Sequence, residues 1–205
     1  HTSTSEVYGT AKYVPIDEDH PLQAQSPYAA TKIGADALVM SFHKSFEVPA
    51  SIVRPFNTYG PRQSARAVIP TLISQLLTRS ERIKLGSIHP IRDFNFVADT
   101  VSGFLAVGNS NRAVGEVINL GSGRGVSIAE LAELLMNLVG HRAKIETSAQ
   151  RVRPVGSEVD RLICDPSHAL ELVGWKPDHT LEQGLEETCQ WVRDHIDSFD
   201  PHVYA

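Results

Sequence analysis

The spacing of apolar residues changes several times along this chain, which predicts alternating helices and strands. Between residues 28 and 46 they recur at roughly helical intervals, and Pro49 closes the segment, which predicts a long amphipathic helix. Residues 50–54 form a short apolar run typical of a buried strand. A strand-like segment also precedes the helix, and a strand, helix, strand order is typical of parallel α/β sheets.

The remaining pattern continues this alternation. Ser127 and Glu130 have the spacing of a capping box at the start of a leucine-rich helix. Helices are predicted at residues 68–78, 101–107 with Asp99 as cap, 127–140, 165–172 with Asp165 as cap, and 181–195, and extended segments at 83–85, 92–97, 114–120 and 144–147. Residues 151–157 read as a basic, polar loop. The pattern as a whole predicts an α/β protein.

Composition limits the function classes. With 205 residues, of which 41% are hydrophobic, the chain is long enough for a real core of one domain or a little more. Its net charge of −5 argues against a general nucleic-acid or membrane-surface binder. Cys164 and Cys189 have no metal-ligand spacing, so we expect neither a metal site nor a disulfide framework. No apolar run has membrane-spanning length, and a reducing, cytoplasmic location fits best.

A glycine-rich turn follows the strand predicted at 114–120. Gly121, Gly123 and Gly125 invite a dinucleotide-binding interpretation, and Glu146 lies where a ribose-binding acid would be sought. The spacing is G-x-G-x-G, however, and its third glycine is misplaced for close packing of helix on sheet. We therefore prefer a flexible turn before a capped helix.

Two segments near the start of the chain carry candidate chemistry. Pro27 suits a first helical position, which places Tyr28 and Lys32 one turn apart on one helix face. The lysine cation would stabilise the phenolate form of the tyrosine and suit it to accept a hydroxyl proton. Residues 4–6 lie where a predicted strand ends before Gly9, and α/β proteins keep their chemistry at strand ends. Alone, these residues could equally be a solvated helix face and backbone caps.

A series of motifs covers nearly the whole chain from His1 to Pro177, in the order TSTSEVYG, SPYAATK, IVRPFNTYGPRQ, IRDFNFVAD, INLGSG, RPVGSEVDRLICD and VGWKP. This ordered set resembles the extended short-chain dehydrogenase/reductase superfamily, and within it the nucleotide-sugar 4,6-dehydratases. The resemblance implies a Rossmann-type, doubly wound parallel sheet that binds NAD, plus a smaller α/β part that binds the substrate. Residues 1–60 would be the C-terminal portion of the NAD-binding domain, and residues 61–205 mainly the nucleotide-sugar part, with some segments returning to the Rossmann core.

The resemblance also implies roles for the reacting groups. Tyr28 is similar to the family's base for hydride transfer at sugar C4, and Lys32 to the partner that also holds the nicotinamide ribose. Pro55 is implied as a further cofactor contact. Thr4 would hydrogen-bond the C4 oxygen, and Glu6 would remove the C5 proton.

The acid that protonates the leaving C6 hydroxyl stays open. Many of these dehydratases carry an aspartic acid where this chain has Ser5, and a serine hydroxyl is a poor acid. The proton could come from Glu6 or from the surroundings of Ser5.

Substrate-binding residues are implied by the same motifs. Asn57 resembles an asparagine near the substrate diphosphate, Arg92 and Arg153 resemble diphosphate-binding arginines, Glu158 the acid that holds the nucleotide ribose, and Asn119 a lesser contact. Guanidinium groups suit phosphate oxygens through paired hydrogen bonds. Taken singly, each arginine could equally form a surface ion pair.

The implied activity is a nucleoside-diphosphate-hexose 4,6-dehydratase. A UDP- or GDP-linked N-acetylglucosamine, or a related sugar, is the expected substrate. A 4-epimerase or decarboxylase of the same superfamily is the enzymatic alternative, and a non-catalytic nucleotide-sugar-binding fragment is the alternative from another class.

Two expectations concern the intact protein. The family's glycine-rich phosphate loop would precede His1, so we expect an N-terminally truncated sequence whose activity belongs to the intact enzyme. A homodimer through the helix at 28–46 is also expected.

Overall fold

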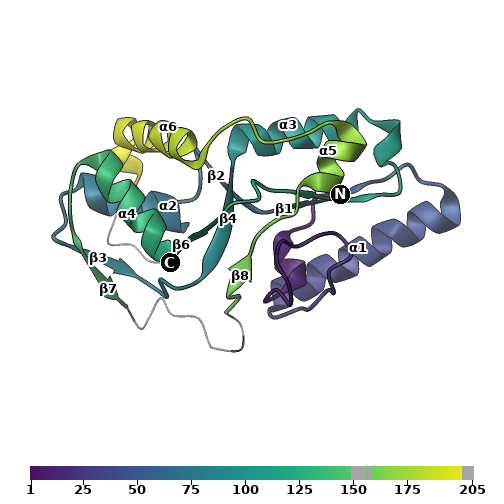
Figure 1. Cartoon of the computed structure of the whole chain (residues 1–205), viewed down its shortest axis with the longest axis horizontal. Coiled ribbons are helices and arrows are strands. Elements are labelled where there is room, and N and C mark those ends of the chain that lie inside the picture. Colours follow the sequence, from purple (N-terminus) through teal and green to yellow (C-terminus); the bar gives the residue numbers. More distant parts are fainter. Residues whose placement is uncertain (149–155, 157, 200–205) are drawn as a thin grey trace.

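The protein is described by a computed structural model, which places residues 1–148, 156 and 158–199. Its strands lie along an elongated body, with helices above and below them (Figure 1). The helices are α1 (Pro27–Phe46), α2 (Val68–Leu77), α3 (Val97–Gly108), α4 (Ile128–Val139), α5 (Ser167–Val173) and α6 (Leu181–Asp194). Short 3-10 helices are η1 (Ser5–Tyr8), η2 (Asn111–Ala113) and η5 (Ile196–Ser198). The mixed α/β class predicted from the sequence is confirmed.

The strands pair mostly in parallel, between segments distant in sequence. β1 (Ile52–Pro55) pairs with β5 (Val117–Leu120), and β3 (Arg82–Leu85) pairs with β7 (Lys144–Thr147). β4 (Ile91–Phe96) pairs in parallel with β2 (Asn57–Tyr59) and β8 (Arg161–Leu162), and antiparallel with β6 (Gly125–Ser127). The predicted strand before Gly9 is reduced to a single parallel bridge between Thr2 and Val53, after which the chain turns into η1.

The predicted helix start is confirmed at α4 but not at α3 or α5, where Pro166 and not the predicted Asp165 is the N-cap. The Ser127 hydroxyl accepts from Glu130 N and the Glu130 carboxylate accepts from Ser127 N, so the predicted capping box of α4 is confirmed. The prediction for α3 was wrong at its start, because the helix begins at Val97 and Asp99 lies inside its first turn. Asp99 instead accepts hydrogen bonds from the backbone of Asp178 and His179, and so fixes the approach to α6.

Helix α1 has the predicted bounds but an unexpected surface. Leu38, Phe42 and Phe46 are 59%, 48% and 71% exposed, whereas Asp36 is only 4% exposed. The large apolar side chains that define the helical period therefore lie mostly outside the core, and the two buried residues of this helix are Ala29 and the carboxylate Asp36.

A buried polar network explains that carboxylate. Asp36 Oδ2 accepts from Arg54 Nε at 3.1 Å, from Arg54 Nη2 at 3.0 Å and from Ser3 Oγ at 2.9 Å. Arg54 Nη1 donates to the Tyr8 hydroxyl at 2.9 Å, and that hydroxyl donates to Asn119 Oδ1 at 2.8 Å. Burial raises the pKa of Tyr8 to about 12, so it remains a neutral donor. The network joins α1, β1, η1 and β5.

The apolar core lies in three clusters. The largest packs α2, α4 and α6 against β2, β3, β4 and β6. A second surrounds Val7 and Tyr8 of η1, and a third packs α3 and α5 with Trp175 against β1 and β5. At Gly184 of α6, a Cβ atom would lie 2.2 Å from the Tyr59 hydroxyl oxygen, so the close approach of this helix requires glycine. No helix of the described residues could cross a membrane.

Candidate functional site

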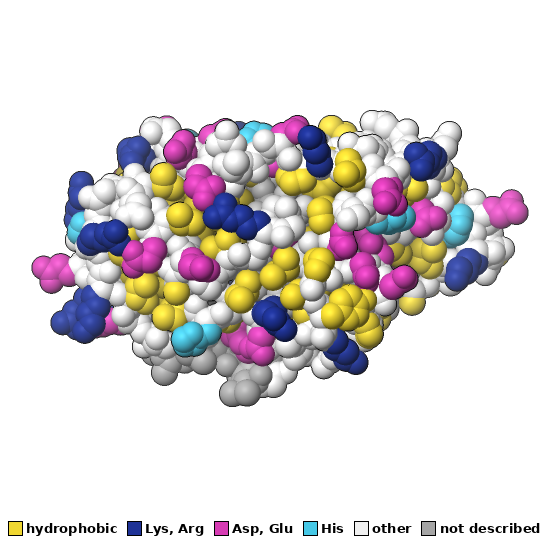
Figure 2. Space-filling model, viewed as in Figure 1, with side chains coloured by type: hydrophobic (Ala, Val, Ile, Leu, Met, Phe, Trp, Pro, Cys, Tyr) yellow, Lys and Arg dark blue, Asp and Glu magenta, His cyan; other side chains and the backbone are white. Residues whose placement is uncertain are grey.

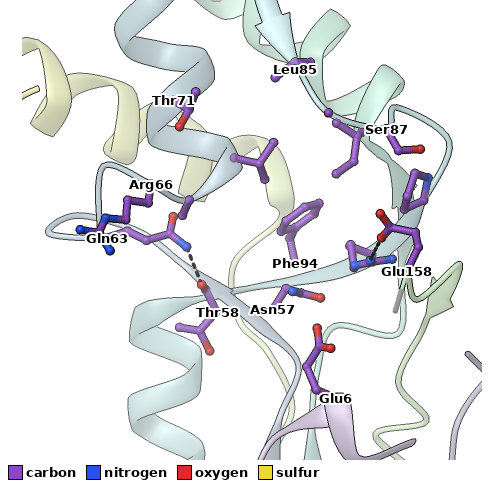
Figure 3. Close-up of a pocket in the computed structure, with 16 residues that line it drawn as sticks. Glu6, Asn57, Thr58, Gln63, Arg66, Thr71, Leu85, Ser87, Phe94 and Glu158 are labelled. Carbon is purple, nitrogen blue, oxygen red and sulfur yellow. Dashed lines mark hydrogen bonds and ion pairs between the residues drawn. The ribbon is translucent and has the colours of Figure 1, made fainter. Parts of the chain in front are cut away.

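A polar cavity of about 380 Å³ opens between η1, the β2–α2 connection, the β3–β4 connection and β4. Its apolar wall consists of Val68, Leu85, Pro90, Phe94 and Ile128. The polar side chains at the cavity include Glu6, Asn57, Gln63, Arg66, Arg92 and Glu158. Figure 3 shows that they come from segments far apart in sequence and surround one space.

Glu6 reaches the cavity from η1. The Thr4 hydroxyl accepts a hydrogen bond from Glu6 N at 3.2 Å, which starts the 3-10 turn and fixes the direction of the residue. The Glu6 side chain extends from η1 toward that of Asn57 (Figure 3). Ser5 is only 3% exposed, and neither Thr4 nor Ser5 lines the cavity.

Tyr28 and Lys32 lie on the first turns of α1, as predicted. Ser26 caps the helix, with Pro27 at its first position. Lys32 Nζ lies 6.0 Å from the centroid of the Tyr28 ring and donates to the Thr2 carbonyl at 3.0 Å, which ties α1 to the segment before η1. Tyr28 is 52% exposed. Neither residue lines the cavity, although α1 and η1 are in contact.

Arg92 and Glu158 form an ion pair at the cavity wall. Arg92 Nη2 lies 3.4 Å from Glu158 Oε1, and the two side chains are 10% and 20% exposed. Arg92 Nη1 also donates to the Ile91 carbonyl at 3.0 Å. The predicted partner Arg153 lies outside the described residues. The structure thus joins the predicted Glu6, Asn57, Arg92 and Glu158 in one cavity.

Asn119 and Pro55 do not reach this cavity. Asn119 is fully buried, and its side chain accepts from the Tyr8 hydroxyl and donates to the Ile16 carbonyl at 3.3 Å. Both of its side-chain groups are therefore bonded within the protein interior, and its role as a lesser substrate contact stays a prediction. Pro55 ends β1 opposite Leu120.

A buried carboxylate, Asp93, already binds backbone N–H groups of the glycine-rich turn after β5. Asp93, which is fully buried, accepts from Ser122 N, Gly123 N and Cys164 N at 2.8, 2.8 and 3.1 Å, and from Ser122 Oγ at 2.6 Å. Burial raises the pKa of Asp93 even though these donors favour its charged form. The backbone N–H groups that a phosphate would need are occupied, which confirms a turn before a capped helix. Glu146 pairs with Arg82 at 2.8 Å.

Gln63 and Arg66 are cavity residues to which the sequence assigned no role. Both follow the turn at Gly60 and lead into α2, where loop polarity looks unremarkable in sequence. Gln63 closes the motif IVRPFNTYGPRQ, and Arg66 lies in the polar run before a helix start, which is a common position for ligand contacts.

Metal-ligand groups and patches of surface charge are two further kinds of site that the described part of the chain could contain. No group of three or more His, Cys, Asp or Glu side chains among those residues could hold a metal ion. Basic and acidic side chains are interspersed over the described part of the face drawn in Figure 2.

Parallel strand pairs flanked by helices, with a polar cavity beyond β2 and β4, define a Rossmann-type α/β protein of the kind that includes dehydratases and epimerases. Residues 1–188 match the model of the GDP-mannose 4,6 dehydratase family, and the chain belongs to that family.

The known proteins that are similar to this chain include both dehydratases and epimerases. The dTDP-D-glucose 4,6-dehydratase of Mus musculus is 32% identical over 195 residues, which are 94% of this chain and 55% of that protein. The structure of dTDP-glucose 4,6-dehydratase from Bacillus anthracis in complex with NAD has a TM-score of 0.88 and 30% identity, with 98% of this chain and 63% of that one covered.

An epimerase structure is equally similar. UDP-glucuronic acid 4-epimerase from Bacillus cereus, in complex with UDP-glucuronic acid and NAD, has a TM-score of 0.87 and 31% identity, with 95% of this chain and 61% of that one covered. The chain therefore spans somewhat more than half the length of these relatives.

Proposed function

We propose that this chain provides the catalytic and substrate-binding portion of an NAD-dependent nucleoside-diphosphate-hexose 4,6-dehydratase. The observation that carries the proposal is the carboxylate of Glu6, directed into the cavity that also contains Asn57 and the Arg92–Glu158 pair. A carboxylate at this point supplies the base that an elimination needs, in addition to the tyrosine that an oxidation needs.

The residues present fit the nicotinamide end of NAD. The Tyr28 hydroxyl has no hydrogen-bond partner in the described part of the chain, and its ring is half exposed. Lys32 uses one of its three donors on the Thr2 carbonyl, which leaves others for a ribose hydroxyl. Pro55 is retained as a proposed further contact. When bound, NAD would accept a hydride from sugar C4 and return it at C6.

The chain's own residues would move the protons. Tyr28 takes the proton of the C4 hydroxyl, and the Lys32 cation stabilises the resulting phenolate. The C4 carbonyl then acidifies C5, and Glu6 removes that proton while Thr4 hydrogen-bonds the C4 oxygen.

Loss of the C6 hydroxyl as water requires an acid. Ser5 is 3% exposed and is a far weaker acid than a protonated carboxyl group. We therefore assign the donor role to Glu6, which passes the proton from C5 to the leaving oxygen.

The proposed substrate is a UDP- or GDP-linked N-acetylglucosamine or a related sugar. The nearly buried guanidinium of Arg92 suits the diphosphate, and Glu158 beside it suits a ribose hydroxyl. Arg153 stays a predicted second diphosphate contact. Residues 61–205 would supply most of this substrate binding, and residues 1–60 would supply the motifs that face NAD. We expect the intact protein to be a cytoplasmic homodimer that associates through α1.

A 4-epimerase is the second candidate, because UDP-glucuronic acid 4-epimerase is as similar in structure as the dehydratases are. An epimerase needs the oxidation at C4 but not the elimination, so a carboxylate at Glu6 would have no step to perform. The same difference provides the test.

The experiment compares wild type with Glu6→Gln in the intact protein that carries this chain. With NAD and UDP-N-acetylglucosamine, wild type should form a 4-keto-6-deoxy sugar that absorbs in base. Glu6→Gln should lose about 10²-fold or more of that rate, as expected for removal of a general base. The exposed Glu186→Gln, on α6, is the matched control and should keep the full rate.

Other results would reject the proposal. A clean 4-epimer without the keto product would favour the epimerase. Full elimination by Glu6→Gln would refute the role of Glu6. Calorimetry that detects nucleotide-sugar binding without any turnover would favour a non-catalytic binding protein.

A further inference from the structure

Two amide oxygens at the cavity are buried and have no hydrogen-bond partner among the residues that the structure describes. They are Asn57 Oδ1 and Gln63 Oε1. Both residues line the cavity beside which Glu6 lies. A buried carbonyl oxygen without a partner costs free energy, and in native proteins such groups are uncommon and often mark functional sites.

The orientation of Gln63 is chemically determined. Its Nε2 donates to the Thr58 carbonyl at 3.0 Å (Figure 3). A carbonyl oxygen can only accept, so the amide group must face Thr58 and the Oε1 acceptor must face away from it. The anchoring bond therefore presents a fixed acceptor beside the cavity.

Another glutamine of the same region shows what a purely structural amide looks like. Gln75 on α2 is 5% exposed, and both of its side-chain groups are satisfied. Its Nε2 donates to the Thr71 carbonyl at 3.1 Å, and its Oε1 accepts from Lys84 N at 2.9 Å. Gln63 Nε2 likewise donates to a backbone carbonyl, but Gln63 Oε1 accepts no hydrogen bond from the described residues.

The location of the acceptor indicates which end of a ligand it meets. Thr58, which anchors Gln63, follows Asn57 directly in β2, and the Glu6 side chain points toward Asn57 (Figure 3). Under the proposed function Glu6 lies at C5 of the hexose, so Asn57 and Gln63 lie on the sugar side of the cavity.

We propose that Gln63 is a sugar-binding residue whose Oε1 accepts a hydrogen bond from a ring hydroxyl or from the N–H of a 2-acetamido group. This inference rests on the proposed function. The ligand supplies the donor that the described part of the chain lacks, and a nucleotide without a sugar leaves the acceptor unpaired. Gln63 thus discriminates between the nucleotide sugar and the bare nucleotide.

The test measures the affinities of UDP-N-acetylglucosamine, UDP-glucose and UDP by calorimetry. Gln63→Met keeps the side-chain length and removes the acceptor. It should weaken binding of UDP-N-acetylglucosamine about tenfold, the effect of one unmade hydrogen bond, and leave UDP unchanged. A loss with UDP-glucose as well assigns the donor to a ring hydroxyl, whereas a loss with UDP-N-acetylglucosamine alone assigns it to the acetamido N–H.

The control is Gln75→Met, which should lower stability but leave the ratio of sugar-nucleotide to UDP affinity unchanged. An equal loss for UDP in Gln63→Met would show that the substitution only disturbs the loop, and would overturn the inference. An unchanged affinity for both sugar nucleotides would overturn it too, while leaving the proposed function intact. If wild type binds no nucleotide sugar, the proposed function fails and the inference fails with it.

Discussion

Replacing Arg54 by Met tests whether the buried polar network holds the site together. The Arg54 and Asp36 side chains are each 5% exposed, so both charges are almost fully removed from water. Arg54 supplies two of the hydrogen bonds to Asp36 Oδ2 and one to the Tyr8 hydroxyl. Its loss leaves Asp36 with Ser3 and with His1, whose Nε2 lies 3.3 Å from Oδ1.

The magnitude follows from the cost of an uncompensated buried charge. Breaking a buried ion pair by removing one partner typically costs about 3–5 kcal/mol, whereas replacing both partners by apolar residues is often neutral or stabilising. A domain is stable by only about 5–15 kcal/mol, so Arg54→Met removes a large share. Asp36→Leu combined with Arg54→Met should recover most of the loss.

The assay is equilibrium unfolding in urea, with the free energy of unfolding extrapolated to water. For a slope of about 2 kcal/mol per molar urea, the expected loss lowers the midpoint by roughly 1.5–2.5 M. Measured together with both single variants, Arg54→Met and Asp36→Leu, the double variant gives the coupling energy between the two side chains.

Two results would refute this reasoning. A cost below about 1 kcal/mol for Arg54→Met, with an unchanged slope, would mean that Asp36 is solvated or satisfied without its partner. A double variant less stable than Arg54→Met would mean that the pair stabilises by more than its burial costs.

Three further predictions follow from single contacts. Asp93→Ala leaves the three backbone N–H groups that it binds unpaired, and should cost about 3–6 kcal/mol in urea unfolding; a cost below about 1 kcal/mol would contradict the role given to Asp93. The hydrogen bond to Asp99 raises the pKa of His179, so its stabilisation is complete below the ordinary histidine pKa and is lost as pH rises through the raised value. The stability difference between wild type and His179→Gln should therefore be larger at about pH 5.5 than at about pH 9, and a constant difference would refute the link. Gly184→Ala gains about 1 kcal/mol of helix propensity but forces a methyl group against Tyr59, so thermal unfolding should show a net loss of about 1–2 kcal/mol, and a stabilised variant would contradict the tight contact.

The sequence predicted the elements whose pattern is local. Helices α1, α2, α4 and α6 agree with the predicted bounds to within a residue, because helical periodicity and encoded caps are visible without tertiary contacts. Strands β2, β6 and β8 were not predicted, since each has only two or three residues and exists through pairing with β4. Short strands of this kind depend on a partner that the local sequence does not reveal.

The site was predicted only in part, because some of its contacts depend on residues that are distant in sequence. Glu6, Asn57, Arg92 and Glu158 meet in one cavity, as the motif order suggested. The sequence did not show that Asn119 faces Tyr8, because an asparagine at the end of a strand looks the same whether it faces a ligand or a buried tyrosine. Gln63 was missed because only the three-dimensional contacts show that one half of its amide is bonded and the other is not.

The contacts of the first residues also determine when the site can form during synthesis. The Tyr8 hydroxyl bonds to a side chain 111 positions further on, and Ile16 pairs with Cys164. A ribosome that adds about 5–20 residues per second needs roughly 6–20 s to reach the first of these partners. Until then the bond from Tyr8 to Asn119 and the bridge from Ile16 to Cys164 cannot form, so the segment that bears Glu6 is made before the partners that complete its packing. The nascent chain therefore bears its proposed general base on an incompletely packed segment at a time when Ile128 and Glu158 of the cavity are still to be translated.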